Sequence, residues 1–585
     1  MKKNFVKSRW FFTILLFVTT MIMPTMMLAE SINPTPPTTG DGSAENPYQI
    51  SSREELYWFA GLVNGTLVGV EKNISANAKL MNDITVNEGV LDAINKDQVS
   101  GKNFIPWTPI GTSGSHDAAY SGTFDGQGHT ISGLYFNDPK ASHVGLFGCI
   151  QDDDNNNKGK ISNVGVSDSY FRFGELGGGV CGKSCYGILQ NCSNSSTVIG
   201  NYSNTGGVCG MNWSGIVRDC KNTGSVRGKT KIGGVCGEND YAGLIENCFN
   251  EGTVSGQDYV GGVCGKSYGM IKSCYNTASV SGQDYVGGVC GSFCNRVTNC
   301  YYLIDTATGG MEGQDKDGLA VKKSLEQFKS GEVAWLLNGK GLGEQLWGQQ
   351  LGKDEYPVLG SDYKVIKAAQ GDKDTYWATF SNQTNDATLS VPSDRSLKVY
   401  NATVSGGKLT LTERDKQVAK KEGVLLKTDG EYVNANKTNE LTTASSDENH
   451  LVATPAEVQI VIAAAGCKLY RLTYNDADTK EGLGFYLSVD RENNSNYGTS
   501  FKATPGKAYL QVSENAAKDP SSAALARSFV FGSGNETTGI DGITIMGTDV
   551  QRHGTIEGIF DLQGRKISNP TKGIYIKNNK KVIIK

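Results

Sequence analysis

The sequence predicts an all-β protein: a right-handed parallel β-helix, or solenoid, with helical caps, followed by one or more antiparallel β-sandwich domains. The phrase Gly-Gly-Val-Cys-Gly occurs five times, with steps of 28, 27, 28 and 26 residues between its cysteines. A period in the twenties is typical of a solenoid, in which each turn packs only against its neighbours. The apolar pieces within each repeat are too short for helices, and short apolar stretches bounded by turn residues continue beyond residue 360.

The fourth repeat, residues 259–282, shows the expected composition of one turn. Its apolar pieces are residues 260–264, 271–274 and 278–280, and Gly, Ser and Asn separate them. Three short strands per turn, in register with the next turn, place equivalent residues about 4.8 Å apart. The glycines are expected at corners, where the backbone takes a positive φ or leaves no room for a Cβ.

Two columns of cysteine follow from this stacking. The first holds Cys181, Cys209, Cys236, Cys264 and Cys290, and the second holds Cys192, Cys220, Cys248, Cys274 and Cys300. Packed free thiols are the favoured interpretation. Disulfides between turns come second, because stacked Cβ vectors run parallel, and a thiol metal site is the least favoured. Cys185 and Cys294 lie outside both columns and are the candidates for pairing or exposure. The alternation does not decide whether Val263 or Cys264 points inward.

The repeats resemble the GLUG-motif family. The third repeat carries the resemblance with Gly-Gly-Val-Cys-Gly at 233–237, Gly-Leu-Ile-Glu-Asn-Cys-Phe-Asn at 243–250 and Gly-Thr-Val-Ser-Gly at 252–256. That family occurs in bacterial surface and secreted proteins, including adhesin-like proteins and the stalks of immunoglobulin A metallopeptidases. The resemblance implies a fold and a location more firmly than an activity.

The chain begins with an expected secretion signal at residues 1–29, in which a basic start precedes an apolar segment at 10–23. This predicts a protein that is secreted or held at the outer cell surface. A Pro- and Thr-rich linker follows at 30–45, and the solenoid with its caps takes residues 46–360.

A helix is expected at each end of the solenoid, because an open end would expose the apolar core. Residues 52–63 have Ser51 or Ser52 as an N-cap and apolar residues on one side. Residues 324–338 begin with a capping box formed by Ser324 and Gln327, and Gly331 is a weak point in that helix.

Two further domains are expected beyond the solenoid. Residues 361–540 read as an antiparallel sandwich or two small ones. Residues 541–585 resemble the C-terminal sorting domain of the type IX secretion pathway, on the phrases at 558–567, 572–576 and 580–585. The resemblance implies the outer-membrane secretion machinery as a partner. The alternative is a set of strands that completes the preceding sandwich.

A candidate ligand-binding site comes from one phrase, Val-Ser-Gly-Gln-Asp-Tyr-Val, which occurs at 254–260 and again at 280–286. Turns in register stack Asp258 on Asp284 and Tyr259 on Tyr285. Tyrosine rings beside carboxylates suit a sugar, because rings offer apolar faces and carboxylates accept hydroxyl protons. The competing interpretation is plain repeat duplication with a solvated surface.

The sequence assigns no catalytic residue, cofactor or metal. None of the five histidines lies in a His-Glu-x-x-His pattern. A serine hydrolase elbow needs Gly-x-Ser-x-Gly before a helix, and Gly-Thr-Ser-Gly at 111–114 falls short of it. Asp125 and His129 are expected in a tight turn between strands. A net charge of −4 argues against nucleic acid as a partner.

The sequence therefore predicts a monomeric, exported, adhesin-like binding protein that presents its solenoid to a glycan or a host protein. The alternative is a carbohydrate-active enzyme, a polysaccharide lyase or a glycoside hydrolase, on the same scaffold. A cleft holding two carboxylates about 5 to 10 Å apart favours that enzyme.

Overall fold

The structure of the chain is a computed structural model that describes most of the sequence in two compact units. Unit 1 is residues 1–348 with 354–360, and unit 2 is residues 349–353 with 361–585. The described residues are 32–96, 103–113, 115, 117–152, 159–314, 319–340, 345–371, 374–438, 448–474, 482–488, 497–518, 520 and 525–531, with the backbone of 543–546, 559–560, 573–577 and 580–584. The expected secretion signal lies outside them.

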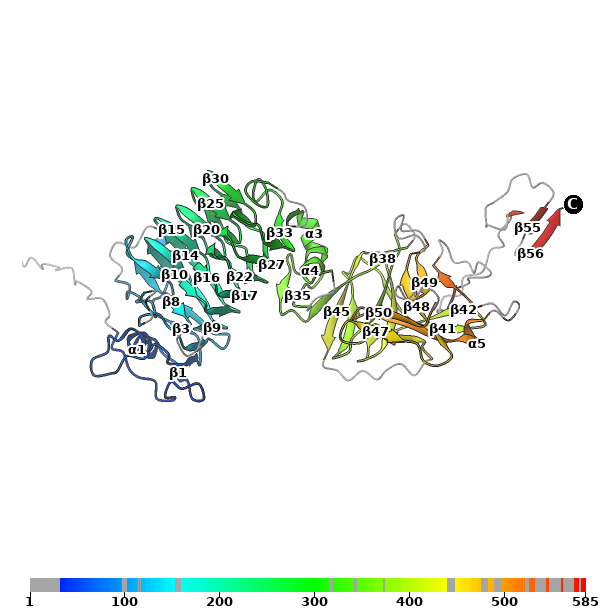
Figure 1. The fold of residues 1–585 in the computed structure, drawn as a ribbon, viewed down its shortest axis with the longest axis horizontal. Coiled ribbons are helices and arrows are strands. Elements are labelled where there is room, and N and C mark those ends of the chain that lie inside the picture. The colour runs from blue at the N-terminus through cyan, green and yellow to red at the C-terminus, as the bar shows by residue number, and fades with distance from the viewer. Residues whose placement is uncertain are drawn as a thin grey trace, which may run out of the picture. The chain divides into compact units, whose positions relative to one another are not determined.

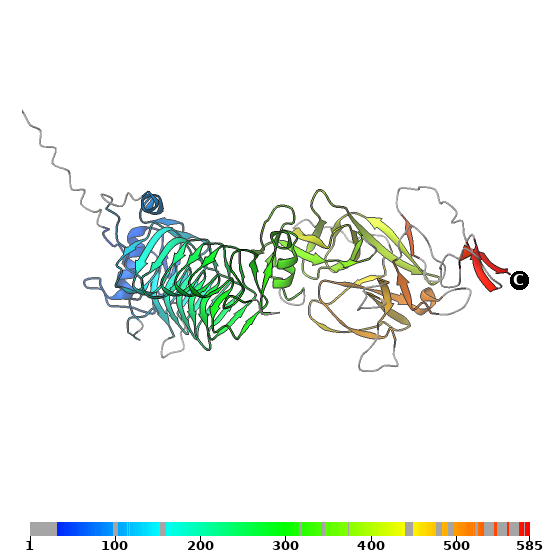
Figure 2. The ribbon, with the colours of Figure 1, turned by 90° about the horizontal axis from the view of Figure 1, so that it is seen from above.

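Unit 1 is a parallel β-solenoid, and the predicted fold class is confirmed. Its strands stack coil on coil into four sheets, named A to D here (Figures 1 and 2). Sheet A is β1 (Tyr48–Ile50), β2 (Ala78–Leu80), β4 (Thr123–Asp125), β9 (Lys160–Ser162), β13 (Ile188–Gln190), β17 (Ile216–Arg218), β22 (Leu244–Glu246), β27 (Met270–Lys272) and β32 (Val297–Thr298). Sheet B is β3 (Ile84–Thr85), β5 (Thr130–Ser132), β6 (Tyr135–Asn137), β10 (Gly165–Phe173), β14 (Ser193–Gly200), β18 (Lys221–Asn222), β19 (Val226–Arg227), β23 (Phe249–Asn250), β24 (Val254–Ser255), β28 (Tyr275–Asn276), β29 (Val280–Ser281), β33 (Cys300–Leu303) and β34 (Ala320–Lys323).

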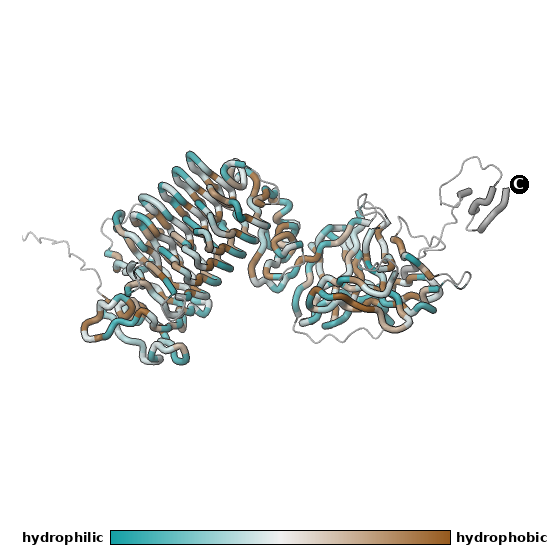
Figure 3. Tube along the Cα trace, in the orientation of Figure 1, coloured by the Kyte–Doolittle hydropathy of each residue, from teal (hydrophilic) through white to brown (hydrophobic). Residues whose placement is uncertain are grey.

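The two shorter sheets carry the Gly-Gly-Val-Cys-Gly phrase. Sheet C is β8 (Phe147–Gln151), β12 (Cys181–Cys185), β16 (Cys209–Trp213), β21 (Cys236–Asn239), β26 (Cys264–Ser267) and β31 (Cys290–Ser292). Sheet D is β7 (Ser142–Val144), β11 (Glu175–Gly178), β15 (Ser203–Gly206), β20 (Thr230–Gly233), β25 (Asp258–Gly261) and β30 (Asp284–Gly287). Hydrophobic and hydrophilic segments recur at the same place in successive coils (Figure 3).

Each regular coil contains more strands than the three expected. The coil that starts at β25 has five short strands, β25 to β29, shared among the four sheets. The apolar piece at 260–264 is divided at Gly262 and Val263, where the chain passes from sheet D to sheet C. The expectation of one strand there was wrong, because the glycine pair allows a sharp corner inside an apolar run.

The double glycines are required because their surroundings leave no room for a Cβ atom, and not because their backbone has a positive φ. A Cβ on Gly234 would lie 2.1 Å from the carbonyl oxygen of Gly262 in the next coil and 2.3 Å from Cγ of Asn250. The positive φ values at other corners belong instead to residues such as Asn191 and Asn247. Asparagine tolerates this conformation better than most residues.

Buried asparagines form a ladder opposite the double glycines, called the asparagine ladder here. It comprises Asn194, Asn222, Asn250 and Asn276 on sheet B. The amides of Asn194, Asn222 and Asn250 each donate to the side-chain oxygen of the next asparagine, at 2.7 to 2.8 Å. These bonds satisfy polar groups that the coil interior hides from water.

Both cysteine columns face the core as free thiols, apart from Cys290. All ten column cysteines are buried, and Val263 is buried together with Cys264, so the corner places both side chains inside. Cys294 forms a disulfide with Cys290 of the same coil, and Cys185 is half-buried and not disulfide-bonded. The favoured interpretation as packed thiols is therefore confirmed for nine column positions, and no disulfide joins two coils in the described residues.

We expect native protein to show only two thiols that react readily with Ellman's reagent, Cys185 and Cys467. These are half-buried, whereas the other ten free thiols are buried. Burial also raises the pKa of the Cys181, Cys192 and Cys248 thiols, which keeps them protonated and unreactive. Titration in denaturant should give twelve thiols. Rapid reaction of many more than two in the native protein would contradict this packing.

Helix α1 (Arg53–Asn64) covers the first coils, close to the expected bounds. The Ser52 hydroxyl accepts a hydrogen bond from the Glu55 amide at 3.2 Å, which identifies Ser52 as the N-cap. Phe59 is fully buried and contacts the rings of Tyr120 and Phe124. A second helix, α2 (Val90–Asn95), was not expected from the sequence.

The helix expected at 324–338 is two short helices, α3 (Leu325–Lys329) and α4 (Glu332–Leu337). The break falls at Gly331, whose φ of 91° ends the helical path. The capping box of Ser324 and Gln327 is present. Both helices pack beside the last coils with β35 (Trp347–Gly348) and β36 (Val358–Leu359), which pair antiparallel.

Unit 2 is built from stacked sheets whose strands pair antiparallel, with one exception. Its strands are β37 (Tyr363–Lys367), β38 (Ala369–Gln370), β39 (Tyr376–Ser381), β40 (Asp386–Ser390), β41 (Leu397–Ser405), β42 (Lys408–Arg414), β43 (Gln417–Val418), β44 (Gly423–Thr428), β45 (Tyr432–Thr438), β46 (Leu451–Ala453), β47 (Gln459–Ile462), β48 (Cys467–Thr473), β49 (Gly484–Leu487), β50 (Ser500–Ala503), β51 (Ala508–Ser513), β52 (Ser528–Val530) and β53 (Ile543–Met546), with helix α5 (Glu514–Ala517). The exception is β53, which pairs in parallel with β42.

The sheet containing β39, β44 and β41 is shared by two cores. On β44, Leu425 packs in one core with Phe485 and Leu510, while Val424 and Leu426 pack in the other with Val433. Successive side chains of a strand point to opposite faces, so both faces of this sheet are covered. The two sandwiches thus share their middle sheet.

The last strands form a separate antiparallel sheet of β54 (Ile559–Phe560), β55 (Gly573–Lys577) and β56 (Lys580–Ile584). β53, by contrast, pairs with β42 and belongs to the sandwich sheet. The assignment of residues 541–585 to a secretion-sorting domain stays a prediction.

Candidate ligand-binding surface

The structure brings Asp258, Tyr259, Asp284 and Tyr285 together on sheet D as two stacked pairs. Asp258 on β25 is in register with Asp284 on β30. The rings of Tyr259 and Tyr285 stack with centroids 4.9 Å apart and an interplanar angle of 18°. Each tyrosine has a φ near 55°, which makes it an outward bulge within its strand.

This stacking changes what the tyrosines offer to a ligand. Their facing sides cover one another, so the pair presents ring edges and hydroxyl groups to solvent, and Tyr285 is 52% exposed. Neither phenol has a hydrogen-bond partner among the residues that the structure describes. The hydroxyls are therefore free to exchange hydrogen bonds with a polar ligand.

A second file of rings runs beside the first, along the end of sheet C. Tyr241 stacks on Tyr268 at 4.8 Å, and Tyr268 contacts the ring of Phe293 at 5.0 Å. Tyr241 is 70% exposed and Phe293 is 44% exposed. These residues follow β21, β26 and β31, so three consecutive coils contribute one ring each.

Lys266 of β26 lies between the two files. Its Nζ is 4.6 Å from the ring centroid of Phe293, 4.8 Å from that of Tyr268 and 5.8 Å from that of Tyr259. These distances are within the range of cation–π attraction. Among the described residues no carboxylate or hydrogen-bond acceptor pairs with this ammonium group. We call Lys266 and these five rings the aromatic face; its members are Tyr241, Tyr259, Lys266, Tyr268, Tyr285 and Phe293.

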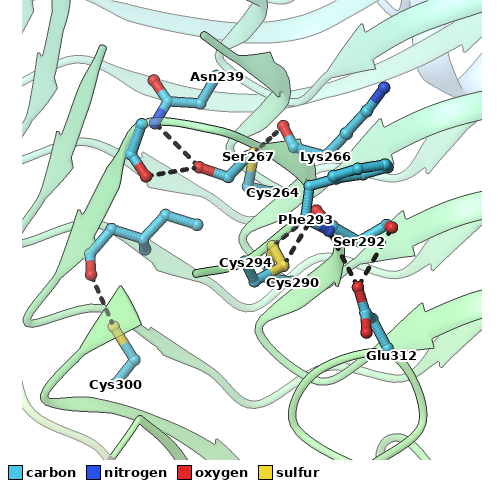
Figure 4. Close-up of a disulfide and its surroundings, with 12 residues drawn as sticks. Asn239, Cys264, Lys266, Ser267, Cys290, Ser292, Phe293, Cys294, Cys300 and Glu312 are labelled. Carbon is cyan, nitrogen blue, oxygen red and sulfur yellow. Dashed lines mark hydrogen bonds between the residues drawn. A yellow bond between two sulfur atoms is a disulfide. The ribbon is translucent and has the colours of Figure 1, made fainter. Parts of the chain in front are cut away.

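A disulfide fixes one edge of the aromatic face. Cys290 and Cys294 enclose Phe293 in a loop of five residues, and the Lys266 side chain runs past this ring (Figure 4). Glu312 accepts hydrogen bonds from the Phe293 amide at 3.0 Å and from the Ser292 hydroxyl at 3.3 Å. Phe293 is thereby held with its ring outward although its φ is 58°.

The sequence missed Tyr241, Lys266, Tyr268 and Phe293 as site residues. The residue type at the Lys266 position differs between repeats, and the aromatic residue that follows each column cysteine does so at a varying distance of three to five residues, so no fixed phrase marks them. A signal was present: Lys266 stands two residues after its column cysteine, a position that points outward in sheet C. Alignment of the repeats on that cysteine would have shown the lysine beside the tyrosines.

A cavity of about 230 Å³ lies elsewhere on unit 1, at the corner between sheets A and B. Asp219 and Lys221 line it with Thr130 and Ser193, and Val358 and Leu359 form an apolar side. Burial raises the pKa of the Asp219 carboxyl. Asp219 is the one carboxylate in this lining, whereas most glycoside hydrolases act with a pair.

Asp125 and His129 occupy the expected turn. The Asp125 carboxylate accepts a hydrogen bond from the Gln127 amide at 3.0 Å, and Gln127 and Gly128 have positive φ values. This bonding is that of an aspartate-stabilised turn. Across the described ranges, no group of three His, Cys, Asp or Glu side chains is arranged to hold a metal ion. Within the same ranges, no helix is both long and apolar enough to cross a membrane.

Fold and surface together place this chain in the class of parallel β-solenoid repeat proteins. The GLUG motif family matches residues 230–255, which confirms the resemblance for that repeat. Halomucin from Haloquadratum walsbyi is 29% identical over 163 residues, which are 28% of this chain and 2% of halomucin. The chain thus spans only a small part of that relative's length.

One solved structure is also similar. A crystal structure of a candidate immunoglobulin A1 protease from Bacteroides ovatus aligns with 19% identity and a TM-score of 0.36, over 55% of this chain and 94% of that chain. A TM-score this low carries no argument about function.

Proposed function

We propose that this chain is an exported, adhesin-like surface or secreted protein that binds a glycan on the aromatic face of its solenoid. The observation that carries the proposal is the convergence of five rings and one lysine from three consecutive coils, held by sheet register and a disulfide. Rings with free hydroxyls, next to the Asp258 and Asp284 carboxylates, suit a partner that is both apolar and rich in hydroxyl groups. The GLUG match supports this, because proteins with these repeats are found on bacterial surfaces and outside the cell.

Rigidity favours binding at this surface. Its side chains stand on strands or immediately after them, and a site on regular elements needs little ordering when a ligand arrives. The solenoid also repeats at about the strand spacing of 4.8 Å. That is close to the length of one pyranose unit, so a linear polysaccharide along the solenoid axis meets equivalent groups at successive sugars.

The test is binding of the purified full chain to a panel of polysaccharides, with Tyr259→Ala/Tyr285→Ala as the altered protein. We expect the double substitution to weaken binding about tenfold or more, since each ring contributes about 0.5 to 1.5 kcal/mol. Tyr497→Ala is the matched control, because Tyr497 is similarly exposed, at 57%, and lies in unit 2. Far-UV circular dichroism should show equal thermal stability for all three proteins.

Two results would count against this proposal. Unchanged binding in the double variant would remove the aromatic face as the site. Shortened polysaccharide products after incubation would instead support the carbohydrate-active enzyme, with the cavity at Asp219 as the place to look next.

A further inference from the structure

We infer that the ligand is an acidic linear polysaccharide, one with carboxylate groups along its length, lying along sheet C over Lys183 and Lys266. The inference rests on the proposed glycan-binding function and specifies the chemical class of the glycan. It comes from one column of outward positions on sheet C. In register along that column stand Lys183, Met211, Glu238, Lys266 and Ser292.

The column holds two lysines of the same kind. Lys183 Nζ lies 5.5 Å from the ring centroid of Trp213, as Lys266 lies over its own rings. Within the described part of the chain, neither ammonium group has an ion-pair or hydrogen-bond partner. Cation–π contact orients a lysine without neutralising its charge, so both remain available to an anion.

The one acidic residue of the column, Glu238, is already paired with a lysine of its own coil. Glu238 is 7% exposed, and its Oε2 accepts hydrogen bonds from Lys231 Nζ and from the Asn204 side-chain amide, both at 2.8 Å. It therefore does not compete for Lys266, although the two residues are in register. Along this column the uncompensated charge is positive at both lysine positions.

The spacing of the lysines defines the length of the ligand. They are three coils apart, which is about 14 Å at the strand spacing of about 4.8 Å. One sugar cannot span this distance, whereas a short chain of about three can. The carboxylates of Asp258 and Asp284 lie on sheet D, so a bound chain places its acidic groups over sheet C and its hydroxyls toward sheet D.

The experiment compares polygalacturonate and hyaluronan with their carboxyl-methylated esters, using the full chain. We expect each acidic polymer to bind about tenfold more tightly than its ester, with a preference that declines as salt is raised. Lys183→Gln and Lys266→Gln should each weaken binding of the acidic polymer about three- to tenfold, and the double variant should lose most of the preference. Lys266→Arg should keep it.

Lys272→Gln is the control, because Lys272 is a strand lysine of the same solenoid that lies on sheet A and is paired with Glu246. Monomeric galacturonate should depend on one lysine at most, since it cannot reach both. Equal binding of acid and ester, or lysine variants that behave like the control, would overturn the inference while the proposed function stands. Absence of binding to every polysaccharide would remove both.

Discussion

Replacing Gly234 with alanine is expected to destabilise the solenoid by about 4 kcal/mol or more, at the upper end of single substitutions. The added Cβ would lie 2.1 Å from the Gly262 carbonyl oxygen and 2.3 Å from Asn250 Cγ. The first contact is with backbone held in the sheet register of the next coil, and the second is with a buried ladder amide. Neither group can move without breaking hydrogen bonds that stack the coils.

The matched control is Gly69→Ala. Gly69 has a φ of 77° with no atom within 4 Å of the added Cβ, so its cost is the backbone strain alone, about 1 to 2 kcal/mol. Denaturant unfolding followed by far-UV circular dichroism measures both variants. If Gly234→Ala were no more damaging than the control, close approach of the coils at this corner would be disproved.

The coil period and the identity of the core columns could be predicted from the sequence. The repeat is visible in the sequence because equivalent residues have the same surroundings in each coil. Cys236 and Cys264, for example, stand in register on neighbouring strands. The corners could not be predicted in the same way. Val263 and Cys264 are both buried, because the glycine pair before Val263 turns the chain at this point. The alternation of inward and outward side chains holds along a strand but not at such a corner.

The candidate site was predictable only in its repeated part. Tyr259 and Tyr285 come from an identical phrase, so their stacking followed from register alone. Lys266 and Phe293 take part through a contact between different positions of neighbouring coils. An alignment of the repeats places both residues near the tyrosines but does not show that contact. The disulfide that encloses Phe293 joins a column cysteine to one outside the columns, and the sequence could say only that Cys294 was a candidate for pairing.

In unit 2 the sequence predicts the strands but not how they pair into sheets. Its strands are visible as apolar stretches between turn residues, yet a run such as Val424, Leu425 and Leu426 does not say which sheet covers each face. The shared middle sheet arises from pairings between strands far apart in the chain. Such pairings leave no periodic trace in one sequence.

Replacing Asn250 with alanine is expected to cost about 3 kcal/mol, through loss of connected hydrogen bonds in the coil interior. Asn250 accepts from Asn222 and donates to Asn276, both at 2.7 Å, and it also bonds both backbone groups of the Gly252 turn. Alanine leaves the Asn222 amide with one acceptor fewer and frees the Gly252 amide in a space closed to water. An unsatisfied buried group costs more than the bond itself contributed.

The ladder supplies its own comparison. Asn276 is the last asparagine of the ladder. It accepts one ladder bond and makes two bonds to its own turn at Ala278, which is three bonds against four for Asn250. Asn276→Ala should therefore cost somewhat less than Asn250→Ala, measured by the same unfolding experiment. In the double variant Gly234→Ala/Asn250→Ala the two costs should not add, because removing the Asn250 side chain relieves one of the two close contacts of the new Cβ. Negligible effects at both asparagines, or strict additivity of the pair, would show that the coils are held by their backbone register and that the ladder amides contribute little.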